Sequence, residues 1–240
     1  MRGLVSALRF LTILPVPFKG DWQPRAGLVW FPAVGLLIGA LAALPLYFLQ
    51  GRISPGIAGL LATLIILALS GGLHLDGLAD CADGFLSHRP RQEVLAIMKD
   101  SRTGAMGVIA IVAALLIKVK GIEAAGVDPW RVVLIMPLAG RVMILLTMAL
   151  LPYARPEGGI GSLFYSPGLW PRALAGLAFF YLAGWYVAGI AGLAAAGAAL
   201  AVTLFFSLLS WYIIGGATGD TLGAACEISE AAVAFAFAFF

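Results

Sequence analysis

The chain has 240 residues, of which 62% are hydrophobic and only 11% are charged. This small number of charged groups cannot cover the surface of a soluble domain. The composition therefore excludes a soluble globular protein and predicts a chain embedded in lipid. The 15 Lys and Arg residues exceed the 12 Asp and Glu residues by only three and form no basic run, which excludes nucleic-acid binding as the main function.

Apolar stretches long enough for membrane helices recur along the chain, because a spanning helix needs about 20 mostly apolar residues. The spans that we expect are 28–49, 56–75, 105–117, 132–151, 173–193 and 195–214, with a seventh at 222–240 if Glu227 and Glu230 lie inside it. The third span is short unless it continues through Lys118 and Lys120, whose long side chains can reach the membrane surface. The sequence therefore predicts an all-α polytopic bundle of six to seven spans, forming a single domain over 1–240.

The positive charges predict how the bundle is oriented. Residues 1–14 are expected to form a helix on the membrane surface, since Arg2 and Arg9 share one helical face and Pro15 ends the segment. With this end inside, ten Lys and Arg residues lie in inner segments and four in outer loops, which favours a cytoplasmic N-terminus at the inner membrane. The polar segments 74–103, 152–172 and 215–221 then share the cytoplasmic face, where we expect a single site.

Three acids dominate the first of these segments. If the chain is helical there, Asp76, Asp80 and Asp83 lie at i, i+4 and i+7 and occupy one face. Neighbouring carboxylates repel one another, and a bound divalent cation would remove that repulsion. Ligands that are all oxygen suit Mg²⁺ or Mn²⁺ rather than zinc, and Mg²⁺ also takes substrate phosphates as ligands. A solvated acidic helix end is the alternative interpretation.

Further charged residues are candidates for the same site. Asp100 could join the metal ligands, although Asp100 or Ser101 could instead cap the following helix. Arg141 lies inside an expected span, where an arginine either pairs with an acid or binds an anion. Glu227 and Glu230 could complete a metal or base site or lie on a water-facing last helix. The residues that we expect to bind substrate are Lys99, Arg102, Arg141, Arg155 and Asp220.

Several motifs together resemble one known family. They are Phe10-Leu11-Thr12 followed by Leu14-Pro15-Val16-Pro17, Phe31-Pro32-Ala33-Val34-Gly35, the stretch from Gly71 to Asp80, Lys99-Asp100-Ser101-Arg102, and the stretch from Thr218 to Ala224. In order and spacing this set resembles cobalamin synthase, the adenosylcobinamide-GDP ribazoletransferase family, from Phe10 to Glu230. Leu73 stands where an aromatic residue is expected, and Thr103 stands where an aliphatic residue is common.

The resemblance implies a Mg²⁺-dependent inner-membrane enzyme. It would join adenosylcobinamide-GDP to α-ribazole or its 5′-phosphate and release GMP, with small-molecule substrates and membrane lipid as its partners. Asp76, Asp80, Asp83, Asp100 and Asp220 stand at positions that match acidic motifs of the family. In the resulting hypothesis the metal lies on the first three of these and grips the diphosphate, and Asp83 accepts the proton of the attacking hydroxyl.

Two other functions remain open at this point. The run Asp80-Cys81-Ala82-Asp83-Gly84 matches the start of the CDP-alcohol phosphotransferase motif, but Phe85-Leu86-Ser87-His88 lacks the Ala-Arg that should follow. A cation transporter would instead place its carboxylates in mid-span and contain inverted repeats. The sequence also leaves a homo-oligomer open.

Overall fold

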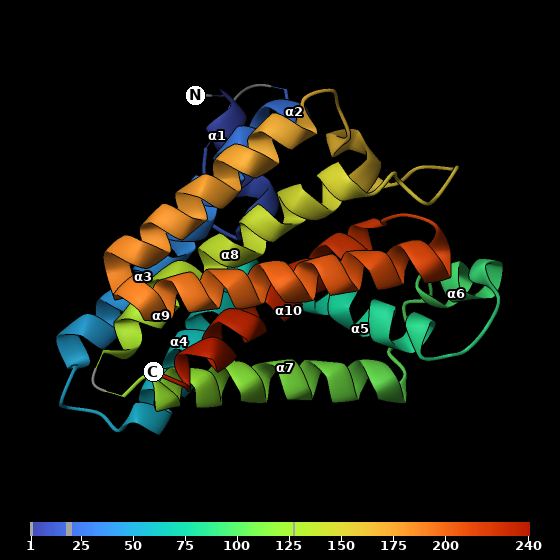
Figure 1. Ribbon diagram of the computed structural model, residues 1–240. Coiled ribbons are helices and arrows are strands. Elements are labelled where there is room, and N and C mark those ends of the chain that lie inside the picture. Colours follow the sequence, from blue (N-terminus) through green and yellow to red (C-terminus); the bar gives the residue numbers. More distant parts are fainter. Residues whose placement is uncertain (1, 18–20, 127) are drawn as a thin grey trace.

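The computed structural model describes residues 2–17, 21–126 and 128–240, and over these ranges it forms helices and no strand, which confirms the all-α prediction (Figure 1). The elements are α1 (Arg2–Leu11), α2 (Pro24–Gly27), η1 (Leu28–Trp30), α3 (Phe31–Leu49), α4 (Pro55–Ser70), α5 (Leu73–Phe85), α6 (Arg91–Ile97), α7 (Ala105–Ala124), α8 (Pro129–Leu150), η2 (Ile160–Phe164), α9 (Leu169–Ile214) and α10 (Gly219–Phe237). Here η marks a short 3₁₀ helix.

The number of membrane spans is smaller than the sequence predicts. Four helical stretches of the described chain are long and apolar enough to cross a membrane, namely Pro24–Leu49, α7, α8 and α9. The pair α4 and α5 makes a fifth only if its bend of 94° lies within one span. The predicted six to seven spans are therefore not confirmed. The last predicted span forms α10, which is not among these stretches because its acids lower its hydropathy.

The predicted span 56–75 does not continue as one helix. Helix α4 ends at Ser70, and Gly71 and Gly72 both take left-handed backbone angles, with φ of 62° and 71°. Residues with a side chain rarely adopt this conformation, so two successive glycines permit the sharp turn. Helix α5 therefore leaves α4 at 94°, and its 13 residues rise only about 20 Å, too little to cross a bilayer core of about 30 Å.

The uncharged stretch after residue 173 forms two helical arms, as expected from its length. The break lies at Gly189, with φ 56° and ψ −129°, and not between residues 193 and 195. At this bend the arms meet backbone to backbone, since a Cβ on Gly184 would lie 2.9 Å from the Gly192 carbonyl oxygen. Figure 1 shows the two arms of α9 running in different directions from the bend.

Helices α8 and α10 form the centre of the bundle. Helix α8 is buried along almost its whole length and packs against α3, α9 and α10. Gly35 and Gly39 of α3 lie against the α8 backbone, with no room for a side chain, and such small residues let helices in a membrane approach closely. Helix α10 also contacts α5 and α7, and it thereby connects the centre of the bundle to the polar segments.

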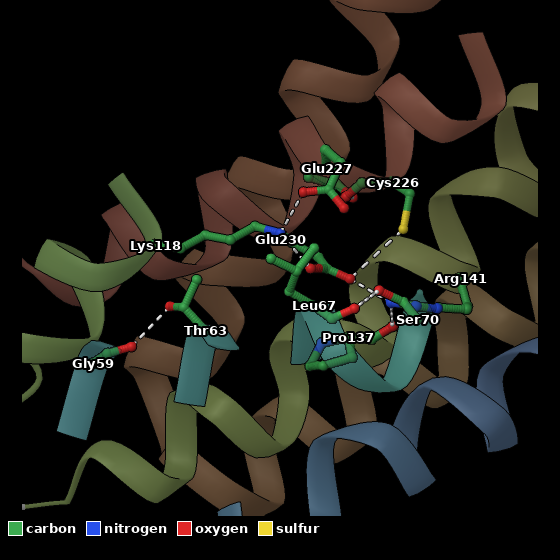
Figure 2. Close-up of polar contacts among 11 residues, drawn as sticks. Gly59, Thr63, Leu67, Ser70, Lys118, Pro137, Arg141, Cys226, Glu227 and Glu230 are labelled. Atoms are coloured by element: carbon green, nitrogen blue, oxygen red, sulfur yellow. Dashed lines mark hydrogen bonds and ion pairs between the residues drawn. The ribbon is translucent and has the colours of Figure 1, made fainter. Parts of the chain in front are cut away.

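Four charged side chains meet in the interior, a group that we call the ionic cluster: Lys118, Arg141, Glu227 and Glu230. The Lys118 Nζ donates to Glu227 and to Glu230, at 2.6 Å each, and Arg141 pairs with Glu230 (Figure 2). The expectation that Lys118 reaches the membrane surface is wrong, because its side chain is only 4% exposed and has two acidic partners. Two positive and two negative charges balance, and this removes much of the cost of burying them.

The N-terminal helix has the predicted amphipathic character. In α1, Arg2 and Arg9 are exposed, whereas Ala7 and Leu11 are buried. Helix α1 packs beside α2 and α3. Its place on a membrane surface stays a prediction.

Candidate functional site

The three polar segments meet in space, as the sequence predicts. The loop after α8 pairs with the segment before α10, since the Ala154 N–H donates to the Ala217 carbonyl at 2.7 Å and the Ala217 N–H donates to the Pro152 carbonyl at 2.8 Å. Arg91, from the segment that follows α5, donates from Nη2 to the Ala154 carbonyl at 3.1 Å. Residues far apart in the sequence therefore lie at one end of the bundle.

A cavity of about 300 Å³ opens where these segments join α1, α3, α5, α8 and α10. Part of its wall is aromatic and part is charged. The lining residues are Phe10, Phe31, Leu73, His74, Asp76, Gly77, Ile144, Met148, Tyr153, Arg155, Gly159, Ile160, Gly161, Phe164, Gly219, Asp220, Leu222 and Gly223. Among them are three residues that the sequence predicts for the site, namely Asp76, Arg155 and Asp220.

Close packing of α5 against α10 brings two of these acids to the same cavity. A Cβ added to Gly77 would lie 2.6 Å from the carbonyl oxygen of Asp220, and one added to Gly223 would lie 3.2 Å from His74. Only glycine allows the two helices to approach this closely. The carboxylates of Asp76 and Asp220 consequently line one cavity, although they are far apart in the sequence.

Adding a methyl group at Gly77 is expected to destabilise the protein. The Gly77→Ala variant should lose about 1–3 kcal/mol in free energy of unfolding, because its Cβ would clash with the α10 backbone. Gly197→Ala is the matched control, since a Cβ there meets no atom of the described residues within 4 Å and alanine favours the helix. Thermal unfolding in detergent measures both, and equal melting temperatures for the two variants would contradict the packing argument.

Arg155 and Asp220 form an ion pair beside the cavity. The Arg155 Nη2 lies 2.8 Å from the Asp220 Oδ2, and the Thr218 hydroxyl donates to the same oxygen at 3.2 Å. Thr218 also caps α10, since its side chain accepts from the Thr221 N–H. Burial raises the pKa of the Asp220 carboxyl, while Arg155 and Thr218 act in the opposite direction.

Asp80 lies one turn further along α5 and is surrounded by negative charge. Burial, together with the negative charges of Asp76 and Asp220, raises the pKa of the Asp80 carboxyl to about 7. The charge of Asp83 also raises the pKa of Asp80, whereas the charge of Arg155 lowers it. Four carboxylates thus lie close enough to influence one another, and a cation at this place would relieve their repulsion.

The structure does not bring every predicted site residue to the cavity. The two Asp83 carboxylate oxygens accept hydrogen bonds from the Gly104 N–H at 2.6 Å and the Gly107 N–H at 2.9 Å, so Asp83 caps the start of α7. Asp100 pairs with Arg102 at 2.6 Å, and these hydrogen bonds lower the pKa of the Asp100 carboxyl to about 2.

The other predicted residues away from the cavity are basic or lie in α10. Lys99 and Arg102 are exposed and do not line the cavity. Arg141 is buried and paired with Glu230, so of the two roles open to an intramembrane arginine the structure shows the ion pair. Glu227 and Glu230 are neither water-facing nor part of the cavity, because they bind Lys118.

Comparison with known proteins then identifies the family. Residues 3–238 match the family model of cobalamin-5-phosphate synthase. The chain belongs to the cobalamin-5-phosphate synthase family. The similarity that the motifs indicate is thereby confirmed, and it favours cobalamin synthesis over the lipid headgroup transferase and the cation transporter.

Curated relatives of this family match the chain over nearly its full length and are named adenosylcobinamide-GDP ribazoletransferase. The relative from Brevibacillus brevis is 38% identical over 97% of this chain and 96% of its own length. The relative from Chlorobium chlorochromatii is 40% identical over 96% and 93%, and that from Acetivibrio thermocellus is 34% identical over 96% and 94%. No solved structure matches the chain.

The acids of this family member do not form a closed set of metal ligands. Within the ranges that the structure describes, no three His, Cys, Asp or Glu side chains are grouped to hold a metal ion, and Asp83 is engaged by backbone N–H groups. Mg²⁺, however, is commonly bound by one or two carboxylates together with waters and substrate phosphates. Asp76 at the cavity and the crowded Asp80 beside it fit that arrangement better than the predicted three-carboxylate site does.

Sequence reasoning missed the aromatic part of the cavity. Phe10, Phe31 and Phe164 come from α1, α3 and η2, and their rings contact one another. Two of them stand in the family motifs, but an aromatic residue in an apolar stretch gives no signal of which distant ring it will meet. His74 also lines the same cavity.

Proposed function

We propose that this chain joins adenosylcobinamide-GDP to α-ribazole or α-ribazole 5′-phosphate and releases GMP. The observation that supports this most is the full-length match to the family, together with Asp76, Asp220 and Arg155 around one cavity. We further propose that the cavity faces the cytoplasm at the inner membrane, as the distribution of Lys and Arg favours.

The chemistry requires positioning and charge neutralisation more than covalent help from the protein. A hydroxyl oxygen of α-ribazole attacks the phosphorus on the cobinamide side of the diphosphate, the bond from that phosphorus to the bridging oxygen breaks, and GMP leaves with that oxygen. Arg155 has five N–H donors, and those that do not bind Asp220 are suited to phosphate oxygens. Arg155 thereby holds the phosphate of the leaving GMP, which gains a further negative charge when the bond to the bridging oxygen breaks.

The hydroxyl proton needs an acceptor at the cavity. Asp83 is poorly suited to this role because both of its oxygens already accept backbone N–H groups. Asp220 lines the cavity, is oriented by Arg155 and Thr218, and has a pKa raised by burial, so it is the carboxylate that we assign. Asp76 and Asp80 would hold Mg²⁺, which neutralises diphosphate charge when it is bound.

Release of GMP by the purified chain in detergent tests this function. With adenosylcobinamide-GDP, α-ribazole and Mg²⁺, GMP should form in step with the corrinoid product. A chelator should reduce the rate to background, because the diphosphate then lacks its counter-charge. Excess Mg²⁺ should restore the rate. A chain that releases no GMP under these conditions would contradict the proposed activity, and chelator-resistant release would contradict the Mg²⁺ assignment alone.

A further inference from the structure

The size of the cavity indicates which of the two substrates it can hold. Pockets for small molecules commonly measure about 300–1,000 Å³, and this one, at about 300 Å³, lies at the small end. A nucleoside fits such a volume, whereas adenosylcobinamide-GDP, with its corrin ring, adenosyl group and GDP, is several times larger. If the proposed function holds, the cavity therefore matches the smaller partner or one small part of the larger one.

The aromatic rings distinguish between these two possibilities. Phe10 and Phe164 have ring centroids 4.6 Å apart, and Phe31 lies 5.8 Å from Phe164 and 6.3 Å from Phe10. All three line the cavity, and Phe31 and Phe164 are only 1% and 3% exposed. They make a compact apolar wall of the kind that packs against a flat ring.

The chemistry of the candidate bases favours ribazole over guanine. The dimethylbenzimidazole base of α-ribazole is a flat, apolar bicycle, and its attachment to ribose leaves one ring nitrogen as a hydrogen-bond acceptor and no donor. Guanine presents several donors and acceptors, and each would lose free energy against phenylalanine rings that offer no partner. A wall of three phenylalanines is therefore complementary to the first base and not to the second.

One polar side chain in the cavity matches that single acceptor. His74 is 4% exposed and lines the cavity, and its Nδ1 has no hydrogen-bond partner in the part of the chain that the structure describes. A buried polar atom without a partner is costly, so such atoms in native proteins call for an explanation. A ligand whose ring nitrogen accepts an imidazole N–H would provide one.

We propose that this cavity is the α-ribazole subsite, with the benzimidazole base against Phe10, Phe31 and Phe164 and with His74 as its hydrogen-bond donor. The ribose then extends toward Asp76 and Asp220, which line the same cavity. This places the hydroxyl that attacks beside the carboxylate assigned to accept its proton. The corrinoid remains outside the cavity and contributes only its diphosphate. The inference rests on the proposed function and adds which substrate the cavity recognises.

The Phe10→Leu variant tests this subsite, because Phe10 is only half-buried and its loss should leave the fold intact. With each substrate varied in turn, its KM for α-ribazole should rise about tenfold, since an aromatic contact and its buried area are lost. Its KM for adenosylcobinamide-GDP should stay within twofold. Phe206→Leu is the matched control, since Phe206 stacks on Phe85 away from the cavity and should change neither KM.

A second variant and a binding assay keep the two proposals apart. Phe164→Leu should reproduce the selective rise in KM for α-ribazole. In the binding assay, α-ribazole alone should raise the melting temperature of the unmodified chain, and it should raise that of Phe10→Leu less. Guanosine should not raise the melting temperature. An equal rise in both KM values, a rise only for adenosylcobinamide-GDP, or stabilisation by guanosine would overturn the subsite. Absence of GMP release from the unmodified chain would instead overturn the proposed function, and the melting experiment would still report on the cavity.

Discussion

The Asp76→Asn variant is expected to release GMP about 10²–10³-fold more slowly than the unmodified chain, the loss typical of removing one group that stabilises charge in a transition state. Asp76 lines the cavity and lies one turn before Asp80, whose pKa is raised by burial and by the negative charge of the neighbouring carboxylates, Asp76 among them. Asparagine keeps the shape of the side chain but removes the charge that would bind a cation. Initial rates of GMP release at saturating substrates provide the measurement.

The matched control for this experiment is Glu93→Gln. Glu93 is an acid on α6 whose side chain pairs with Arg89 at the exposed surface, so its loss should leave the rate within twofold. Thermal unfolding of both variants separates a chemical effect from a folding defect. An Asp76→Asn protein that melts normally and turns over at the unmodified rate would rule out Asp76 as part of the reaction site.

The Lys118→Met variant is expected to lose about 3–5 kcal/mol in free energy of unfolding, the usual cost of removing one partner from a buried ion pair. Lys118 is the cation between Glu227 and Glu230, and its removal leaves two carboxylates facing Arg141 alone. Lys120→Met, two residues along α7, is the control, because Lys120 is 72% exposed and its pair with Glu123 is at the surface. Unfolding in detergent measures both.

A double variant tests whether charge balance is the cause. Lys118→Met combined with Glu227→Gln leaves one cation and one anion, Arg141 and Glu230, and should recover part of the lost stability. If the double variant is less stable than Lys118→Met, or if Lys118→Met is as stable as Lys120→Met, then the ionic cluster does not stabilise the fold in this way.

The sequence predicts those features of the fold that depend on nearby residues. Hydropathy places α3, α7 and α8 close to their observed positions. The distribution of Lys and Arg among the loops predicts that the three polar segments lie on the same face. The sequence also places Asp76, Asp80 and Asp83 on one helix. It does not show that α4 ends at Ser70, just before Gly71, because glycine is frequent in membrane helices and only some glycines take a left-handed conformation.

The features that the sequence does not predict depend on distant partners. An arginine such as Arg141 within an apolar stretch needs an anion, but the sequence cannot say whether a substrate or Glu230, 89 positions away, supplies it. Asp83 belongs to an acidic motif, and only the structure shows that the N–H groups of Gly104 and Gly107 already occupy it. Local spacing predicts a shared helical face, whereas tertiary packing decides what each side chain on that face contacts.

Helix α10 connects the interior of the bundle to the cavity, since Asp220 lies in its first turn and Glu227 and Glu230 lie two to three turns further along. A helix is stiff over this length, so a displacement of its middle also displaces its first turn. Substitution of a charged residue in the ionic cluster should therefore misalign Asp220 and slow turnover at temperatures where the protein is still folded. Enzymatic failure in such variants would precede melting.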